Sequence, residues 1–161
     1  MSPTSHVFRC GLEWVAAPGE KTTDFSAYHR EHVVKVEGKP DLTMSAAPEY
    51  RGDPSRHNPE ELFVMALSSC QMLTYLAMAG RAGIDVIGYT DEAEGTLELA
   101  PGPGGRRVMR MTRVTLRPRI RVAAGTEAER ALVLVEKAHD GCFIASSVSC
   151  EVMSDPEVIV G

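Results

Sequence analysis

The chain has 161 residues, of which 43% are hydrophobic and 24% are charged, with a formal net charge of −5 at pH 7. This composition is typical of one soluble globular domain, and it excludes disordered, collagen-like and multi-span membrane proteins. The negative charge disfavours a general nucleic-acid binder. Four cysteines are too few for a secreted disulfide scaffold, and the first residues lack a basic region followed by an apolar run. We therefore expect a single domain over residues 1–161 with reduced thiols, located in the cytoplasm.

Three strands are predicted in the first part of the chain. Residues 6–16 alternate, with Phe8, Cys10, Leu12, Trp14 and Ala16 on one face. Residues 31–36 and 42–46 read as two further strands, and residues 37–41 form the turn between them.

The next element is a long helix that begins at Pro59 and ends near Gly80 and Gly83. Asn58 is a suitable cap, proline fits the first helical position, and the glutamates that follow suit the positive end of the helix dipole. Residues 62–80 carry no charge. This run is just long enough for a membrane span, but its serines, Gln71 and Thr74 dilute its apolarity, and we expect no membrane. A helix that is apolar all round needs protein on all sides, so we predict that a second subunit covers part of it.

The remaining residues predict two long strands, a second helix and a last strand. Residues 88–99 and 107–122 flank a turn at 101–105 and form a hairpin. Thr126 and Glu129 have the spacing of a capping box, and the helix that follows ends at 139–141. The last strand covers residues 148–160 and is interrupted by Asp155 and Pro156. Together these elements predict an α+β fold with a mostly antiparallel sheet and two main helices.

Seven arginines and no acidic residue lie between Arg106 and Arg121. Along a strand, Arg113, Arg117, Arg119 and Arg121 fall on one face, and apolar residues fall on the other. A basic patch for an anionic partner is one interpretation, but a solvated outer face explains the pattern without a ligand. We therefore expect a solvated face and no nucleic acid.

Two of the cysteines are candidates for chemistry. Cys70 lies in a short polar interruption of the apolar helix, and two interpretations are open from its position: a small core residue or a reactive thiol. Cys142 directly follows a helix end, where the negative end of the dipole disfavours a thiolate. Such a thiol is a poor first nucleophile, but it can condense with a sulfenic acid on another cysteine. Cys10 and Cys150 are expected to be structural strand residues.

The helix start and the two cysteines together resemble the osmotically inducible protein C and organic hydroperoxide resistance (OsmC/Ohr) family. The resemblance is carried by Asn58, Pro59, Glu60, Glu61, Leu62, Ala66, Ser69, Cys70, Ala138 and Cys142. The order of the predicted elements also fits, so the resemblance covers nearly the whole chain. Phe143 after the second cysteine, Gln71 after the first, and residues 28–32 and 88–95 resemble a less studied branch of the family.

The resemblance implies a thiol peroxidase that reduces organic hydroperoxides without a metal, flavin or other cofactor, in an intertwined homodimer built around the long helices. By position, Cys70 is the peroxidatic thiol and Cys142 the resolving thiol, with a disulfide between them that a dithiol reductant, such as a lipoyl group, reopens.

Glu60 matches the functional glutamate of the family. It lies ten residues before Cys70 on one helix, roughly 15 Å along the axis, so it approaches the Cys70 of another chain more easily than its own. A thiol in the middle of a helix needs a nearby cation to lower its pKa, and the resemblance implies that an arginine supplies it. Arg51 is our first choice, and Arg56 and Arg30 are alternatives.

Two other interpretations compete with that of a thiol peroxidase. The five histidines raise the question of a metal site, but the cysteine spacing matches no zinc motif and we expect none. The second is a non-catalytic or weakly active dimer of the same fold that binds a small apolar ligand or partner. Apolar residues near Cys70 suit either a hydrophobic peroxide or a dry core.

Overall fold

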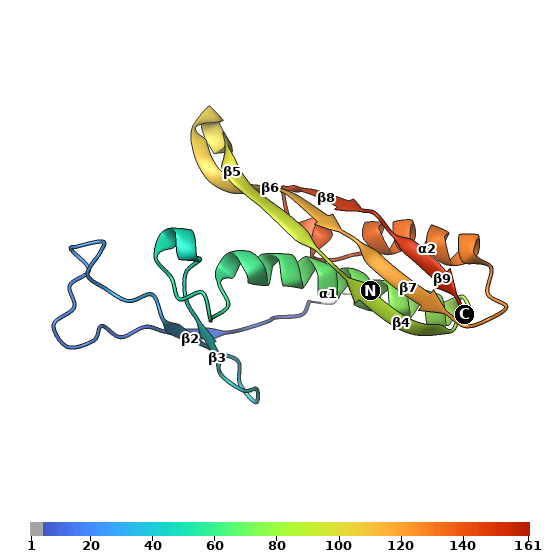
Figure 1. The fold of residues 1–161 in the computed structure, drawn as a ribbon, viewed down its shortest axis with the longest axis horizontal. Coiled ribbons are helices and arrows are strands. Elements are labelled where there is room, and N and C mark those ends of the chain that lie inside the picture. The colour runs from blue at the N-terminus through green and yellow to red at the C-terminus, as the bar shows by residue number, and fades with distance from the viewer. Residues whose placement is uncertain (1–4) are drawn as a thin grey trace. The chain divides into compact units, whose positions relative to one another are not determined.

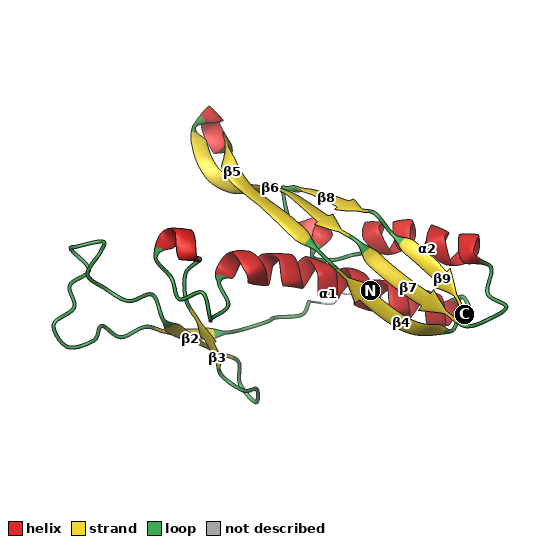
Figure 2. Ribbon diagram, in the orientation of Figure 1, coloured by secondary structure: helices red, strands yellow, loops and turns green. Residues whose placement is uncertain are grey.

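The structure is a computed structural model that describes residues 5–161. Its backbone forms two compact units, of which the first ends at Leu62 and the second begins at Phe63. The boundary falls in the first turn of the long helix α1 (Pro59–Arg81). Figures 1 and 2 show both units, with their helices and strands. A single domain over residues 1–161 stays a prediction.

The first unit holds a small antiparallel sheet of β1 (Gly11–Glu13), β2 (His32–Lys35) and β3 (Leu42–Met44), in that order. Gly38 has a φ of 76° in the turn between β2 and β3, which is a conformation that glycine adopts freely. The strand predicted over 6–16 is wrong in length, because only Gly11–Glu13 pair with β2. Cys10 lies before the strand and is exposed, so it is no strand residue.

Helix α1 begins as the sequence predicts. The Asn58 side chain accepts a hydrogen bond from the Glu61 N–H at 2.9 Å, and the Glu61 carboxylate accepts one from the Asn58 N–H at 3.3 Å. This reciprocal pair is a capping box, which satisfies two backbone donors that the helix start would leave without partners. At the other end, Gly83 takes a φ of 68° and the Ile84 N–H donates to the Ala79 carbonyl.

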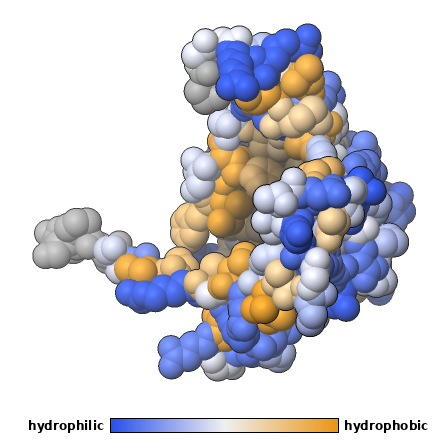
Figure 3. Space-filling model, turned by 90° about the vertical axis from the view of Figure 1, so that its left-hand side faces the viewer, coloured by the Kyte–Doolittle hydropathy of each residue, from blue (hydrophilic) through white to orange (hydrophobic). Residues whose placement is uncertain are grey.

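One face of α1 is buried and the opposite face is exposed. Leu67, Gln71, Tyr75 and Ala79, each four residues apart, are the buried ones. The opposite face is equally free of charge, and its exposed residues are Met65, Ala66, Ser69, Leu73, Leu76, Ala77 and Gly80. By length and composition alone α1 passes the test for a membrane span, as core helices of soluble proteins also do. Figure 3 shows that apolar residues also lie open on the surface that faces the viewer.

The second unit contains two three-stranded sheets where one was expected. One sheet is β4 (Val86–Asp91), β7 (Pro118–Val122) and β9 (Glu157–Val160); the other is β5 (Glu94–Pro101), β6 (Arg107–Leu116) and β8 (Glu151–Ser154). The pairs β4–β7 and β5–β6 are antiparallel, whereas β6–β8 and β7–β9 are parallel. The β5–β6 hairpin projects beyond the helices (Figure 1) and turns through a short 3-10 helix, Pro103–Gly105. The fold is α+β.

The strands predicted over 88–99 and 107–122 are each two strands, because the chain passes from one sheet to the other in the middle of each. Asp91 stabilises the point at which the chain passes from one sheet to the other. Its carboxylate accepts a hydrogen bond from the Arg117 N–H at 2.7 Å and another from the Ser68 hydroxyl of α1 at 2.5 Å. The break of the last strand at Asp155 and Pro156 is confirmed, since β8 ends at Ser154 and β9 begins at Glu157.

Helix α2 (Ala128–Asp140) packs with α1 and β7 in one apolar cluster that includes Tyr75, Ile120, Ala131 and Val135. The predicted capping box at Thr126 is wrong, because the helix starts one residue later than that motif requires. Its cap is Glu127, which makes no side-chain capping hydrogen bond.

The arginine-rich strands have the predicted alternation. Val114, Leu116, Ile120 and Val122 are buried, while the arginines point outward. Three of these arginines pair with glutamates of neighbouring strands: Arg113 with Glu151 at 3.0 Å, Arg117 with Glu94 at 3.1 Å, and Arg119 with Glu157 at 3.4 Å. These carboxylates neutralise much of the basic face, which fits a solvated outer surface.

We expect Leu116→Ala to destabilise the protein by about 2–5 kcal/mol, because Leu116 is 1% exposed and its loss leaves a cavity among Leu67 and Val114. Leu132→Ala on α2 is the matched control. Leu132 is 41% exposed, so its cost should stay below about 1 kcal/mol. Equilibrium urea unfolding measures both, and equal costs would contradict the placement of Leu116 in the core.

Candidate functional site: a pair of neighbouring thiols

Cys70 lies in the middle of α1, at the border between the buried and the exposed face of the helix, and is half-buried. The next residue, Gln71, is fully buried. One turn further on, the Thr74 hydroxyl donates to the Cys70 carbonyl at 2.8 Å. The thiol is therefore held on a regular helix and has a partly open surface.

Cys142 lies two residues beyond the end of α2 and is 1% exposed. Gly141 lets this end of α2 come close to α1, because a Cβ at position 141 would lie 2.9 Å from the Met78 side chain and 3.5 Å from that of Thr74. After Cys142 the chain turns back. The Cys142 N–H donates to the His139 carbonyl, and the Ala145 N–H points to the Cys142 sulfur at 3.5 Å.

The Cys70 and Cys142 thiols are neighbours that affect each other's pKa, and both are free. Burial raises the pKa of Cys70, but four hydrogen bonds together outweigh it and leave that pKa below its ordinary value. In order of size, the groups that lower it are the Cys142 thiol, the backbone N–H groups of Ile144 and Phe143, and the Thr74 hydroxyl, whose main hydrogen bond goes to the Cys70 carbonyl. All four are neutral, whereas the sequence suggested that a cation would be needed.

The pKa of Cys142 is shifted in the opposite direction. Burial raises it first, and the hydrogen bond and negative charge of Cys70 raise it further, against weaker donation from the Ala145 and Ile144 N–H groups. The direction of the pKa shift agrees with the expectation for a thiol behind a helix end, and burial is its largest cause. The pair therefore consists of one thiol that ionises early and one that stays protonated.

The other two cysteines do not belong to this pair. Cys150 is half-buried beside the cluster of Leu67, Val114 and Leu116, and burial raises the pKa of its thiol. Cys10 is exposed. Within residues 5–161, no group of three His, Cys, Asp or Glu side chains is placed to hold a metal ion.

Glu60, which belongs to the first unit, lines a cavity of about 490 Å³ in that unit. Trp14, Tyr28 and Tyr50 supply aromatic walls, and Arg30 lines the same cavity. One carboxylate oxygen of Glu60, Oε2, is buried and has no hydrogen-bond partner in the described part of the chain. Unpartnered buried carboxylate oxygens are rare and call for an explanation.

The three candidate arginines have different surroundings. Arg51 is exposed in a left-handed conformation with a φ of 67°, at the end of the short helix Pro48–Tyr50. Arg56 is paired with the Asp53 carboxylate at 3.1 Å. Arg30 is the one that shares the cavity of Glu60, with its guanidinium 4.0 Å from the ring centre of Tyr28.

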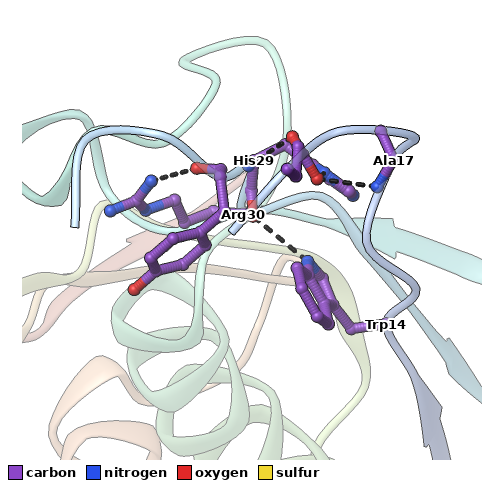
Figure 4. Close-up of polar contacts among 6 residues, drawn as sticks. Trp14, Ala17, His29 and Arg30 are labelled. Atoms are coloured by element: carbon purple, nitrogen blue, oxygen red, sulfur yellow. Dashed lines mark hydrogen bonds and ion pairs between the residues drawn. The ribbon is translucent and has the colours of Figure 1, made fainter. Parts of the chain in front are cut away.

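Figure 4 shows how this loop is held together. Arg30 donates to the carbonyls of Tyr28 and Phe25, the latter at 2.6 Å. The Trp14 indole stacks on His29 and donates to its carbonyl at 3.1 Å. Glu20 accepts from the Ala17 N–H at 2.7 Å and lies 2.6 Å from His29 Nδ1. The Ala17 N–H is the main cause that lowers the pKa of Glu20.

The sequence does not reveal the donors around Cys70, since the amides of Phe143 and Ile144 are backbone groups whose direction no residue pattern encodes. Trp14 and Arg30 lie just outside strands β1 and β2 and line the same cavity, a proximity that the predicted strand boundaries do not indicate. The choice among Arg51, Arg56 and Arg30 stays a prediction.

Comparisons with known proteins agree with this fold. The family model described as "OsmC-like protein" matches residues 52–155, which is more than half of the chain. No match was found among curated proteins. Among solved structures, an OsmC-like protein of unknown function from Vibrio cholerae is 32% identical, with a TM-score of 0.83 and coverage of 96% of this chain and 100% of that one.

Two more distant structures share the fold. An organic hydroperoxide resistance protein OsmC from Legionella pneumophila is 21% identical, with a TM-score of 0.65 and coverage of 96% and 98% of the two chains. An organic hydroperoxide resistance protein from Elizabethkingia anophelis is also 21% identical, with a TM-score of 0.65 and coverage of 98% and 100%. On the family match and the 32% identical structure, this chain belongs to the OsmC-like protein family.

Proposed function

We propose that this protein is a thiol peroxidase that reduces organic hydroperoxides to alcohols. The observation that carries the proposal is the neighbouring pair of thiols Cys70 and Cys142, in which one thiol has a lowered pKa and its partner a raised pKa. A thiolate is the reactive nucleophile, and a neighbouring thiol that stays protonated is ready to resolve the oxidised product. Family membership supports this chemistry, because relatives of the same fold are named organic hydroperoxide resistance proteins.

In the first step, the Cys70 thiolate attacks the terminal oxygen of the hydroperoxide. A sulfur–oxygen bond forms, the O–O bond breaks, and the alkoxide leaves and takes up a proton to become the alcohol. The sulfur loses two electrons and the peroxide gains them, which leaves a sulfenic acid on Cys70.

In the second step, the Cys142 sulfur attacks the Cys70 sulfur. A disulfide bond forms, the sulfur–oxygen bond breaks, and the hydroxide leaves as water with the proton of Cys142. A dithiol reductant then donates two electrons by thiol–disulfide exchange and leaves as a disulfide. Such a cycle suits the reducing cytoplasm, which we keep as the proposed location.

Glu60 and an arginine are proposed to complete the site. The unpartnered Glu60 Oε2 and its shared cavity with Arg30 favour Arg30 for this role over Arg51, whose side chain is exposed. Because Glu60 lies ten residues before Cys70 on α1, we assign it to the Cys70 of a second copy. Its role and that of the arginine remain part of the proposal.

The exposed face of α1 supports a homodimer. It presents Met65, Leu73 and Leu76 with exposures of 45%, 59% and 37%, and small residues between them. A contiguous apolar face of this kind is costly in water and is typical of an interface. We propose that the α1 of a second copy covers it, as the family resemblance implies.

A second candidate function is supported by the cavity of the first unit. Its aromatic walls and volume of about 490 Å³ match those of sites for small apolar ligands. A protein with this role binds such a ligand without turnover. The 32% identical relative is described as being of unknown function, so it favours neither candidate.

We expect Cys70→Ser to abolish the consumption of cumene hydroperoxide in the presence of a dithiol, because the serine hydroxyl does not ionise at neutral pH. Cys142→Ser should still react once, and its Cys70 sulfenic acid should then be trapped by dimedone. A ferrous-oxidation assay measures the peroxide, and mass spectrometry identifies the trapped cysteine.

Cys150→Ser is the control, since Cys150 is half-buried but lies outside the pair. It should retain full consumption and the Cys70–Cys142 disulfide. Peroxide consumption that survives in Cys70→Ser would contradict the peroxidase proposal and favour ligand binding. The absence of peroxide consumption by the unaltered protein with any dithiol would do the same.

The rate at which iodoacetamide alkylates Cys70 should rise with pH and level off above its pKa, because only the thiolate reacts. The inflection should lie below that of an unperturbed cysteine thiol, given the lowered pKa. Cys142→Ala removes one donor to the thiolate, so its inflection should move to higher pH. In Cys150→Ala it should stay in place. An inflection that is the same with and without Cys142 contradicts the role of that hydrogen bond.

Leu73→Arg should convert a dimer into monomers of 17.5 kDa, since it places a charge in the middle of the apolar face of α1. Leu132→Arg on α2 is the matched control and should stay dimeric. Sedimentation velocity at micromolar concentration distinguishes the two. A folded monomer of the unaltered protein counts against the dimer.

A further inference from the structure

Two side chains of α1 reach across to the backbone of α2. The Gln71 amide Nε2 donates to the Val135 carbonyl at 3.2 Å, and the Tyr75 hydroxyl donates to the Ala131 carbonyl at 3.3 Å. The donors are four residues apart on α1 and the acceptors are four residues apart on α2, so each pair lies on one helix face. The two bonds form a ladder with two rungs.

The ladder restricts how α2 can slide or rotate against α1. Sliding either helix by one residue moves the acceptors away from both donors, because hydrogen bonds are directional. The apolar contacts alone are less selective, since α2 presents small residues such as Ala131, Val135 and Ala138 to this cluster. Gln71 and Tyr75 are both 0% exposed, so water does not compete for these bonds.

The ladder lies next to the thiol pair. Gln71 directly follows Cys70, and Val135 lies two helical turns before Cys142. The position of α2 along α1 therefore decides where Cys142 meets Cys70.

If packing were the only role of Gln71, an apolar residue would stabilise the core more. The Gln71 Oε1 is buried with no partner among residues 5–161, and an apolar side chain of the same length would avoid that loss. The bond to Val135 is the one feature of Gln71 that an apolar residue cannot replace.

We propose that Gln71 and Tyr75 are positioning residues that hold Cys142 in register with Cys70 for disulfide formation. This inference rests on the proposed function only in that the two thiols react with each other. The ladder acts by raising the effective concentration of one thiol at the other, which orientation and proximity control.

The test is the equilibrium of the Cys70–Cys142 disulfide with glutathione, measured by alkylation and mass spectrometry over a range of redox buffers. Gln71→Met keeps the length of the side chain and removes the rung to Val135. The equilibrium constant for the disulfide should fall about threefold to tenfold, the span that one net hydrogen bond represents. The stability of the reduced protein should stay equal or rise, because the unpartnered oxygen is removed as well.

Tyr75→Phe and Tyr89→Phe form a matched pair. Both tyrosines pack in the same cluster, but the Tyr89 hydroxyl is buried without a partner in the described residues, whereas that of Tyr75 bonds to α2. Tyr75→Phe should lower the disulfide equilibrium constant by a similar factor, and Tyr89→Phe should leave it unchanged.

Unchanged equilibrium constants in both Gln71→Met and Tyr75→Phe overturn the inference, as does an equal fall in Tyr89→Phe. These measurements use no peroxide. A protein that forms the disulfide with the predicted variant effects but consumes no hydroperoxide would overturn the proposed function and leave the positioning role supported.

Discussion

Helix α1 has no polar side, and the arrangement of the second unit depends on this constraint. A helix that is apolar all round cannot lie on a surface with one face in water. The second unit covers one face with α2 and β7, through Tyr75, Ala79 and their neighbours. Cys70 lies at the edge of that covered face, where it is close enough to α2 to meet Cys142 and open enough to meet a substrate.

The difference between the pKa values of the two thiols arises mainly from burial and hydrogen bonding. Both cysteines are partly or fully buried, and burial alone raises the pKa of either one. Cys70 differs because the turn after α2 directs the N–H groups of Phe143 and Ile144 toward its sulfur, together with the Cys142 thiol. The largest of the causes that lower the pKa of Cys70 is the Cys142 thiol, which in the proposed cycle is also the group that reacts with the oxidised Cys70.

Much of this could be predicted from the sequence, and the failures have physical causes. The signals for α1 are local, namely Asn58 as cap and proline next to it, and they place its start correctly. The sequence predicts one continuous strand over 107–122 because the alternation of arginines and apolar residues persists through Arg117. The change of sheet depends on a hydrogen bond from the Arg117 N–H to the carboxylate of Asp91, which is distant in the sequence. The position of Cys142 directly after α2 can be predicted from the sequence. Which amides lower the pKa of Cys70 depends on tertiary packing and cannot be predicted in this way.

The neutral donors around Cys70 have a consequence for how the protein responds to its solution. Dissolved ions screen the field of exposed charges within about 10 Å at 0.1 M salt, and they act far less on groups that are buried and in direct contact. A thiolate held by a loop arginine would become more basic as salt is added. A thiolate whose pKa is lowered by neutral groups in direct contact, as the pKa of Cys70 is lowered by the Cys142 thiol and two backbone amides, is expected to change its acidity little with ionic strength.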